Sequence, residues 1–290
     1  MNGVEQKLPR PGFWMAVLLV GLVVLVQIVL GLLDVLVERF LHHSAPHLER
    51  QPLVMGGINL VAFGAAVAIG LRLNRLPFRR AFPVGRITVF QVVGVAITLL
   101  GTDVLLSDAD NVLRALLPVP HWLAEFFEDV IYTKNALFSR IVLLVIVAPV
   151  TEELLFRGII LRGFLSRHRP TVAVVLTAVL FAALHANPWQ FVSSLFLGIA
   201  FGWFYMRTGS VWLCVLAHAF SNGLAIACTL LPVDLPGLVG TSETTSVVFQ
   251  PWWLDLSGLV LLLVGLPAFI KASPATPAST TPAPPVTGAT

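Results

Sequence analysis

The chain has 290 residues, of which 57% are hydrophobic and 11% are charged, and its mean hydropathy is +0.89. Soluble domains carry about 25% charged residues, so this composition excludes a soluble globular protein and predicts a polytopic membrane protein. The net charge of +3 does not indicate a nucleic-acid partner, because Lys and Arg in a membrane protein report mainly the side on which each loop lies.

Eight apolar segments have about the length that a helix needs to cross a bilayer, which is about 20 residues. We therefore predict an all-α polytopic membrane bundle of about eight transmembrane helices. The predicted spans are residues 13–33, 52–71, 87–106, 136–165, 171–186, 189–206, 211–231 and 251–270. Pro149 is expected to kink the fourth span. In the sixth, Gly198 and Gly202 have GxxxG spacing, which serves close helix packing inside the chain or with a partner.

The distribution of basic residues predicts the orientation of the bundle. If the N-terminus is cytoplasmic, 13 of the 18 Lys and Arg residues fall on the cytoplasmic side of an eight-span chain and 5 on the other side. This bias follows the positive-inside rule. An even number of spans then places the C-terminus in the cytoplasm as well.

The predicted spans divide the chain into four parts. Residues 1–135 hold three spans and an extracytoplasmic connection (107–135) whose acidic and aromatic residues predict a short interfacial helix. Residues 136–231 form the predicted catalytic helical core, and residues 232–270 a loop and the last span. Residues 271–290 are rich in Ala, Pro, Thr and Ser and are predicted to be disordered.

The fourth span carries two carboxylates and a guanidinium in the sequence V-T-E-E-L-L-F-R-G, residues 150–158. A charged residue at the centre of a membrane helix costs about 2.5–3.5 kcal/mol, so such residues have partners or a task. Helical spacing places Glu153 and Arg157 one turn apart, which suits an ion pair, and a purely structural pair would explain them equally well. Glu152 points about 100° away from Glu153, so the two carboxylates need not do the same job.

Two later spans add further polar groups. His185 lies in the fifth, and His218 and Asn222 lie one turn apart in the seventh. Taken singly, His185 would be an ordinary histidine bonded to a carbonyl, and Asn222 an ordinary link between helices. Together with Glu152 they form a set that can activate water and bind a carbonyl oxygen, and facing lipid would be costly for all of them. Asp103 and Asp255 are expected near span ends, within reach of water or headgroups.

Three short motifs occur in order, each in a separate predicted helix: E-E-L-L-F-R (152–157), F-A-A-L-H (181–185) and H-A-F-S-N (218–222). They resemble the EExxxR, FxxxH and HxxxN/B motifs of the CPBP family of intramembrane proteases. This family includes the type II CAAX prenyl endopeptidases and bacterial bacteriocin-processing or self-immunity proteins. Each motif alone is weak evidence, whereas the ordered triple is specific. The resemblance covers residues 136–231.

The resemblance implies a protease that cleaves peptide bonds inside or at the edge of the membrane. It implies that Glu152 is the general base that activates water, helped by His185. His218 and Asn222 would stabilise the oxyanion. Glu153 and Arg157 would hold the base in place, and Phe181 is the first residue of the second motif.

Zinc stays open as a cofactor, and no other cofactor is indicated. Glu152, His185 and His218 would make a His₂Glu site with one open position, leaving Glu153 as the base. The chain lacks the HExxH spacing that would make zinc the simple answer, and we favour the metal-free scheme.

The main alternative function is a non-catalytic membrane immunity or scaffold protein that binds a peptide or a membrane partner through the same polar groups. A transporter is disfavoured because the chain has no detectable internal repeat. The expected partners are the lipid bilayer and a peptide or membrane-protein substrate, and the composition favours a bacterial plasma membrane. The substrate, its prenylation, the oligomeric state and the depth of the site are not specified by the sequence.

Overall fold

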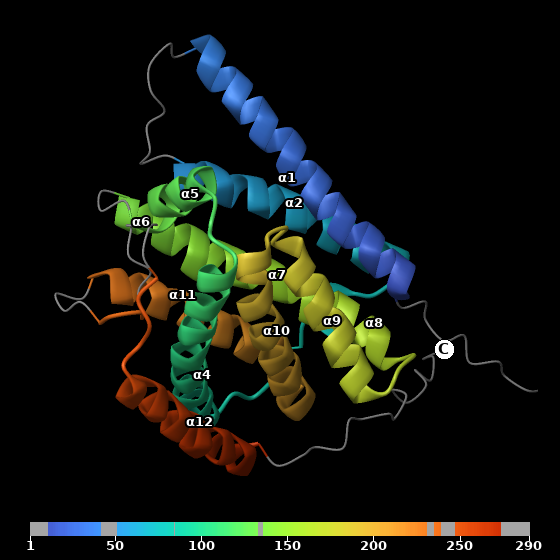
Figure 1. Ribbon diagram of the computed structural model, residues 1–290. Coiled ribbons are helices and arrows are strands. Elements are labelled where there is room, and N and C mark those ends of the chain that lie inside the picture. The colour runs from blue at the N-terminus through green and yellow to red at the C-terminus, as the bar shows by residue number, and fades with distance from the viewer. Residues whose placement is uncertain are drawn as a thin grey trace, which may run out of the picture.

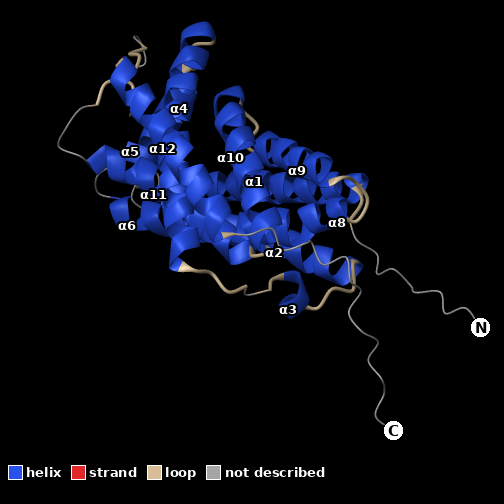
Figure 2. Cartoon of the chain, turned by 90° about the horizontal axis from the view of Figure 1, so that it is seen from below, coloured by secondary structure: helices blue, strands red, loops and turns tan. Residues whose placement is uncertain are grey.

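The computed structural model describes residues 11–41, 51–83, 85–132, 136–230, 235–238 and 247–273. Within these ranges every regular element is a helix (Figure 2). The elements are α1 (Phe13–Leu41), α2 (Gln51–Leu73), α3 (Phe78–Ala81), α4 (Val89–Leu116), α5 (His121–Tyr132), α6 (Leu137–Arg140), η2 (Ile141–Val147), α7 (Ala148–Leu155), η3 (Phe156–Leu161), α8 (Arg162–Leu165), α9 (Pro170–Leu184), α10 (Pro188–Thr208), α11 (Val211–Leu230) and α12 (Trp252–Ala272). Here η marks a π-helix.

Each of the eight predicted spans corresponds to helical structure. Six helices in the described part of the chain, α1, α2, α4, α10, α11 and α12, are long and apolar enough to cross a membrane. The fifth predicted span corresponds to α9, which has 15 residues. The fourth corresponds to the helical path from α6 to α8, in which two π segments, η2 and η3, alternate with α-helix. A helical membrane bundle is therefore confirmed, while the count of eight and the cytoplasmic termini stay predictions. The predicted disordered tail lies outside the described residues from residue 274 onward.

Two predicted boundaries were wrong. α1 continues to Leu41, and α4 continues to Leu116 instead of ending at residue 106. The last part of α4 stays helical although it is polar, because its side chains have partners: Ser107 and Asn111 donate to the carbonyl of Gly237, and Arg114 pairs with a carboxylate one turn away. The predicted short helix of this region forms after α4 ends, as α5.

The broken helix α6–α8 lies at the centre of the bundle, between α2 on one side and α11 on the other (Figure 1). Around it the longer helices pack in pairs: α4 along α12, α9 along α10 and α1 along α2. The residues of α7 and η3 are therefore largely enclosed by protein, whereas α6 and η2 keep exposed side chains such as Phe138 and Ile146. Leu155, Phe156, Ile160 and Leu161 have no exposed surface.

Glycines allow the closest helix contacts. The α4–α12 seam contains Gly94 and Gly101 on one helix and Gly258 and Gly265 on the other, and a Cβ on Gly94 would lie 2.8 Å from the backbone of Phe269. Backbones in contact at this range leave no room for a side chain. The GxxxG pair of α10 also serves internal packing, because a Cβ on Gly198 would lie 3.1 Å from Ala178 of α9.

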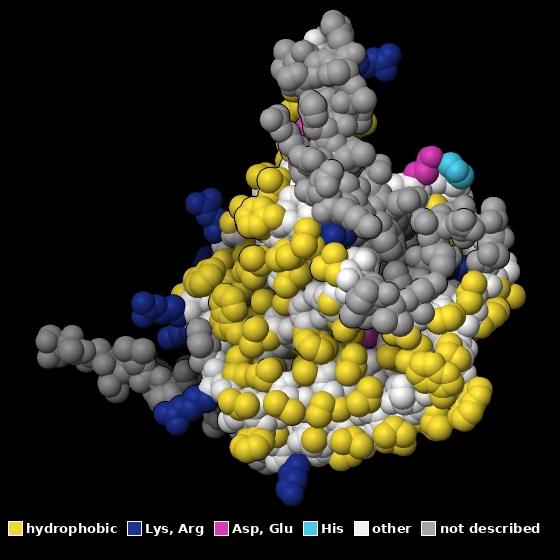
Figure 3. All heavy atoms as spheres, turned by 90° about the vertical axis from the view of Figure 1, so that its left-hand side faces the viewer, with side chains coloured by type: hydrophobic (Ala, Val, Ile, Leu, Met, Phe, Trp, Pro, Cys, Tyr) yellow, Lys and Arg dark blue, Asp and Glu magenta, His cyan; other side chains and the backbone are white. Residues whose placement is uncertain are grey.

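The outer surface is that of an integral, multi-pass membrane protein. Large apolar side chains are exposed along α1, α4 and α12, including Leu18, Phe90 and Leu263. Figure 3 shows hydrophobic side chains spread across one face of the molecule, with Lys and Arg side chains at its margins. Such a surface would be an aggregation liability in water and is the expected surface in lipid.

The basic connections gather at one end of the bundle. Arg162 donates to the carbonyls of Arg80 and Ala81, and Arg167 donates to the carbonyl of Pro11, just before α1. Arg207, at the end of α10, donates to Ile270 near the end of α12. Gly85, before α4, lies against Ser210, after α10, and so joins these two groups of segments that are predicted to be cytoplasmic.

Candidate active site

The two glutamates lie on a short α-helix between two π segments. η2 ends at Val147, α7 runs from Ala148 to Leu155, and η3 begins at Phe156. A π turn spreads the backbone and changes the direction of the side chains that follow, and such turns are frequent at functional sites. Where a kink at Pro149 is expected, the structure has a π segment, η2, that ends two residues before the proline. It places Glu152 and Glu153 in the enclosed part of the path, with exposed fractions of 9% and 0%.

Glu153 and Arg157 form a fully buried ion pair. The Arg157 Nη1 atom donates to Glu153 Oε1 over 2.9 Å, and its Nη2 atom donates to the carbonyl of Gly198 on α10, also over 2.9 Å. The guanidinium lies over the rings of Phe181 and Phe201, at 5.0 and 5.4 Å from their centroids. Rings and a backbone carbonyl replace the water that a buried guanidinium loses.

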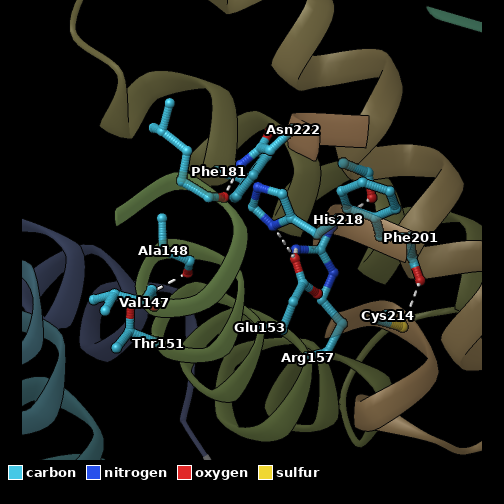
Figure 4. A network of polar contacts seen from close by, with 12 residues as sticks. Val147, Ala148, Thr151, Glu153, Arg157, Phe181, Phe201, Cys214, His218 and Asn222 are labelled. Carbon is cyan, nitrogen blue, oxygen red and sulfur yellow. Dashed lines mark hydrogen bonds and ion pairs between the residues drawn. The ribbon is translucent and has the colours of Figure 1, made fainter. Parts of the chain in front are cut away.

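His218 completes this network from α11 (Figure 4). Its Nδ1 atom lies 3.1 Å from Glu153 Oε1, so one carboxylate oxygen accepts from both the histidine and Arg157. The ring stacks on Phe201 with centroids 5.2 Å apart. Because Nδ1 donates to the carboxylate, the remaining nitrogen of the ring, Nε2, is left for other chemistry.

Glu152 differs from Glu153 in having no such partners. Its Oε2 atom is buried and has no hydrogen-bond partner among the described residues. Glu153 Oε2 is unpaired as well, but Glu153 Oε1 accepts from Arg157 and His218. The Glu152 carboxylate interacts electrostatically with His218, Glu153 and Arg157, which places it beside the network without being bonded into it. The two carboxylates thus have different hydrogen-bond partners, and whether they do different jobs stays a prediction. A buried carboxylate oxygen without a donor is costly and is an available acceptor for water or substrate.

The ring of His185 is held by Phe181, the first residue of the FxxxH motif. His185 follows the last residue of α9, and its Nδ1 atom lies 3.1 Å from the carbonyl of Phe181, one turn earlier. Since a carbonyl can only accept, Nδ1 carries the proton, and Nε2 of a neutral ring is an acceptor. The Phe181 ring contacts both imidazoles, with centroids 5.3 Å from His185 and 5.8 Å from His218. Phe181 therefore joins the two histidines and the guanidinium.

Asn222 is held by the backbone of η2. Its Nδ2 atom donates to the carbonyl of Leu144 over 2.8 Å. The π pattern would assign that carbonyl to the N–H of residue 149, which is a proline and has none, while the N–H of Ala148 is bonded to Leu143. The side chain of Asn222 supplies the donor that the backbone lacks, and one N–H of its amide is left over.

Asp103 of α4 is a further carboxylate near these groups, and its predicted place was wrong. Because α4 extends to Leu116, Asp103 lies near the middle of this helix and not at the end of a span. Both of its carboxylate oxygens lie 2.8 Å from the hydroxyl of Ser221, the residue before Asn222. It also interacts electrostatically with His218.

The side chains do not fit a zinc site. In the described part of the chain, no group of three or more His, Cys, Asp and Glu residues is placed to hold a metal ion. This includes Glu152, His185 and His218, the set that would form a His₂Glu site. We therefore derive no step through a metal.

Comparisons with known proteins agree with this arrangement of motifs. Residues 134–224 match the family model described as type II CAAX prenyl endopeptidase Rce1-like. The resemblance to the CPBP protease family is thereby confirmed. A Bacillus subtilis (strain 168) protein named "Putative membrane peptidase YdiL" is 30% identical over 88 residues, which are 30% of this chain and 36% of that relative. The similarity thus spans about a third of this chain and about a third of the relative. No solved structure matches the chain.

Sequence analysis did not identify several groups that complete this candidate site. Phe201 stacks on His218, and the carbonyls of Gly198 and Leu144 accept from Arg157 and Asn222. Backbone carbonyls leave no signature in a sequence, and one phenylalanine among nineteen gives no signal of its own. Asp103 could have been singled out as a charge in an apolar helix, had the end of α4 been placed correctly.

Proposed function

We propose that this chain is an intramembrane endopeptidase that hydrolyses peptide bonds of membrane-associated or lipidated peptides and proteins. The observation that carries this proposal is the contrast between the two neighbouring glutamates. Glu153 accepts hydrogen bonds from Arg157 and His218 through its Oε1 atom, whereas no described residue donates to either carboxylate oxygen of the buried Glu152. A structural charge pair explains Glu153 but does not explain Glu152.

In the proposed mechanism Glu152 is the general base. It removes a proton from water, and the hydroxide attacks the carbonyl carbon of the scissile peptide bond. Glu152 then returns the proton to the leaving amine as the C–N bond breaks, so the products are a carboxylic acid and an amine. The Nε2 atom of His185 is an acceptor that helps to hold the water, since its Nδ1 atom is committed to Phe181.

His218 and Asn222 are proposed to stabilise the oxyanion of the tetrahedral intermediate. Nδ1 of His218 donates to Glu153, so a proton on Nε2 makes that nitrogen the donor to the oxyanion. The second N–H of the Asn222 amide is the other donor, since the first is bonded to Leu144. Removing one such donor typically lowers kcat by about 10²–10³.

Glu153 and Arg157 are proposed to hold the geometry without taking part in proton transfer. Arg157 connects α7 to α10 through Gly198, and Glu153 connects it to α11 through His218. The pair thereby fixes the helices from which the reacting side chains project.

The bacterial plasma membrane is the proposed location, and whether the substrate is prenylated is left to experiment.

The test is Glu152→Gln in purified protein, with Glu125→Gln as the matched control because Glu125 is exposed on α5. A fluorogenic peptide series in detergent micelles, prepared with and without a farnesyl group, reports turnover. We expect Glu152→Gln to lose at least about 10³-fold in kcat while keeping its thermal unfolding temperature, and the control to keep both. Two negative results together would favour the non-catalytic binding protein. The wild-type protein would hydrolyse none of the reporters, and membranes of cells with Glu152→Gln would contain the same peptides as those of wild-type cells.

A further inference from the structure

The proline before the two glutamates has an effect on the opposite helix. Pro149 is the second residue of α7, two positions after the end of η2. As a proline it has no backbone N–H and cannot donate a hydrogen bond. Proline inside a helical path destabilises it, and small apolar residues would continue the helix better. Its presence next to the reacting groups therefore calls for an explanation other than helix stability.

The missing N–H leaves one particular carbonyl without a backbone donor. In η2 the carbonyl of residue i accepts from residue i+5, as Leu143 does from Ala148. Leu144 would accept from position 149 in this pattern, and from Ala148 in a normal α-helix. The first donor is absent because residue 149 is Pro149, and the second is already used.

That carbonyl is the hydrogen-bond partner of Asn222. The Asn222 Nδ2 atom lies 2.8 Å from Leu144 O, and α11 packs against η2 and α7. A primary amide whose first N–H is fixed in this way also has the direction of its second N–H fixed, because the amide is planar. The hydrogen bond thus sets the direction of the donor that the mechanism needs.

We infer that Pro149 is a positioning residue for Asn222: by removing the backbone donor, it keeps the Leu144 carbonyl available to orient the amide. This inference rests on the proposed function only for the role of Asn222 in catalysis. The effect of Pro149 on the hydrogen bond of Asn222 does not depend on any activity.

The test combines Pro149→Ala with Asn222→Ala in a double-mutant cycle. Pro149→Ala restores an N–H at position 149, so we expect kcat to fall about tenfold with KM little changed, while the Tm rises by about 2–4 °C. Greater stability with lower kcat is a result that a merely structural proline would not give. In the Asn222→Ala background, Pro149→Ala should change kcat by less than about twofold, because the group it acts through is gone.

Pro267→Ala is the matched control. Pro267 also lies inside a helix, α12, but on an exposed position away from the site, so its replacement should change stability without changing kcat. An unchanged kcat in Pro149→Ala would overturn the inference. So would an equal loss of kcat with and without Asn222, or failure of Pro149→Ala to accumulate as folded protein.

A second readout separates this inference from the proposed function. If the wild-type chain hydrolyses no peptide, the cycle is measured in Tm alone. The decrease in Tm caused by Asn222→Ala should be larger with Pro149 than with Ala at position 149. Only in the protein with Pro149 does the Leu144 carbonyl depend on the Asn222 amide for its hydrogen bond. Equal decreases would overturn the inference, whatever the activity assay shows.

Discussion

The α4–α12 seam and the site around α7 are two helix interfaces of the same bundle, built by opposite means. The seam brings two backbones together through Gly94, Gly101, Gly258 and Gly265, and its contacts are close packing. The site joins α7, α9, α10 and α11 through buried charges, imidazoles and aromatic rings. Small residues are sufficient to hold membrane helices together. The costly polar groups of the site are therefore better explained by chemistry than by assembly.

The largest expected effect is on the polar interface. Arg157→Met removes the guanidinium that pairs with the buried Glu153 carboxylate and leaves His218 bonded to it, which should lower the free energy of unfolding by about 3–5 kcal/mol. Thermal unfolding in a fixed detergent measures this loss. Adding Glu153→Gln should restore a large part of it, because the uncompensated charge is then removed. If the single variant melted like wild type, the ion pair would not be an important link between these helices.

An intermediate effect is expected at the seam. Gly94→Val places a side chain against the backbone of Phe269 and should cost about 1–3 kcal/mol or more through overpacking. Because the seam carries no chemistry, kcat of the protein that remains folded should be unchanged. Gly57→Val in α2 is the control, since a Cβ there meets no atom within 4 Å. A lower kcat in the folded fraction of Gly94→Val would contradict the separation of the two interfaces.

The smallest effect concerns the place where the two interfaces approach each other. Asp103 lies on α4, one of the two helices of the seam, but it contacts Ser221 in α11, the helix that carries His218 and Asn222. Ser221→Ala removes the donor that Asp103 has there and should lower the free energy of unfolding by about 1 kcal/mol, whereas Ser221→Thr keeps the hydroxyl and should lose less. Unfolding temperatures of the two variants decide this. Equal losses would assign the effect to packing and not to the hydrogen bond.

The sequence was a good guide where side chains carry the signal. Composition and apolar length predicted a helical membrane bundle, and six of the expected spans are described helices of sufficient length. The charges of α7 stood out because they are rare in apolar segments, and the spacing of Glu153 and Arg157 predicted their ion pair. The ordered motifs indicated the family that the comparisons then matched. The catalytic roles of these residues remain proposals.

Other features were decided only by the folded chain, because they depend on which helices become neighbours. The amino acids alone could establish that Glu152 and Glu153 differ in direction, but not that His218 bonds to one of them and leaves the other without a donor. The pairing of Asn222 with Leu144 requires a π turn, a proline and a facing helix together. Periodicity describes one helix at a time, whereas hydrogen bonds between helices are set by their relative rotation and approach.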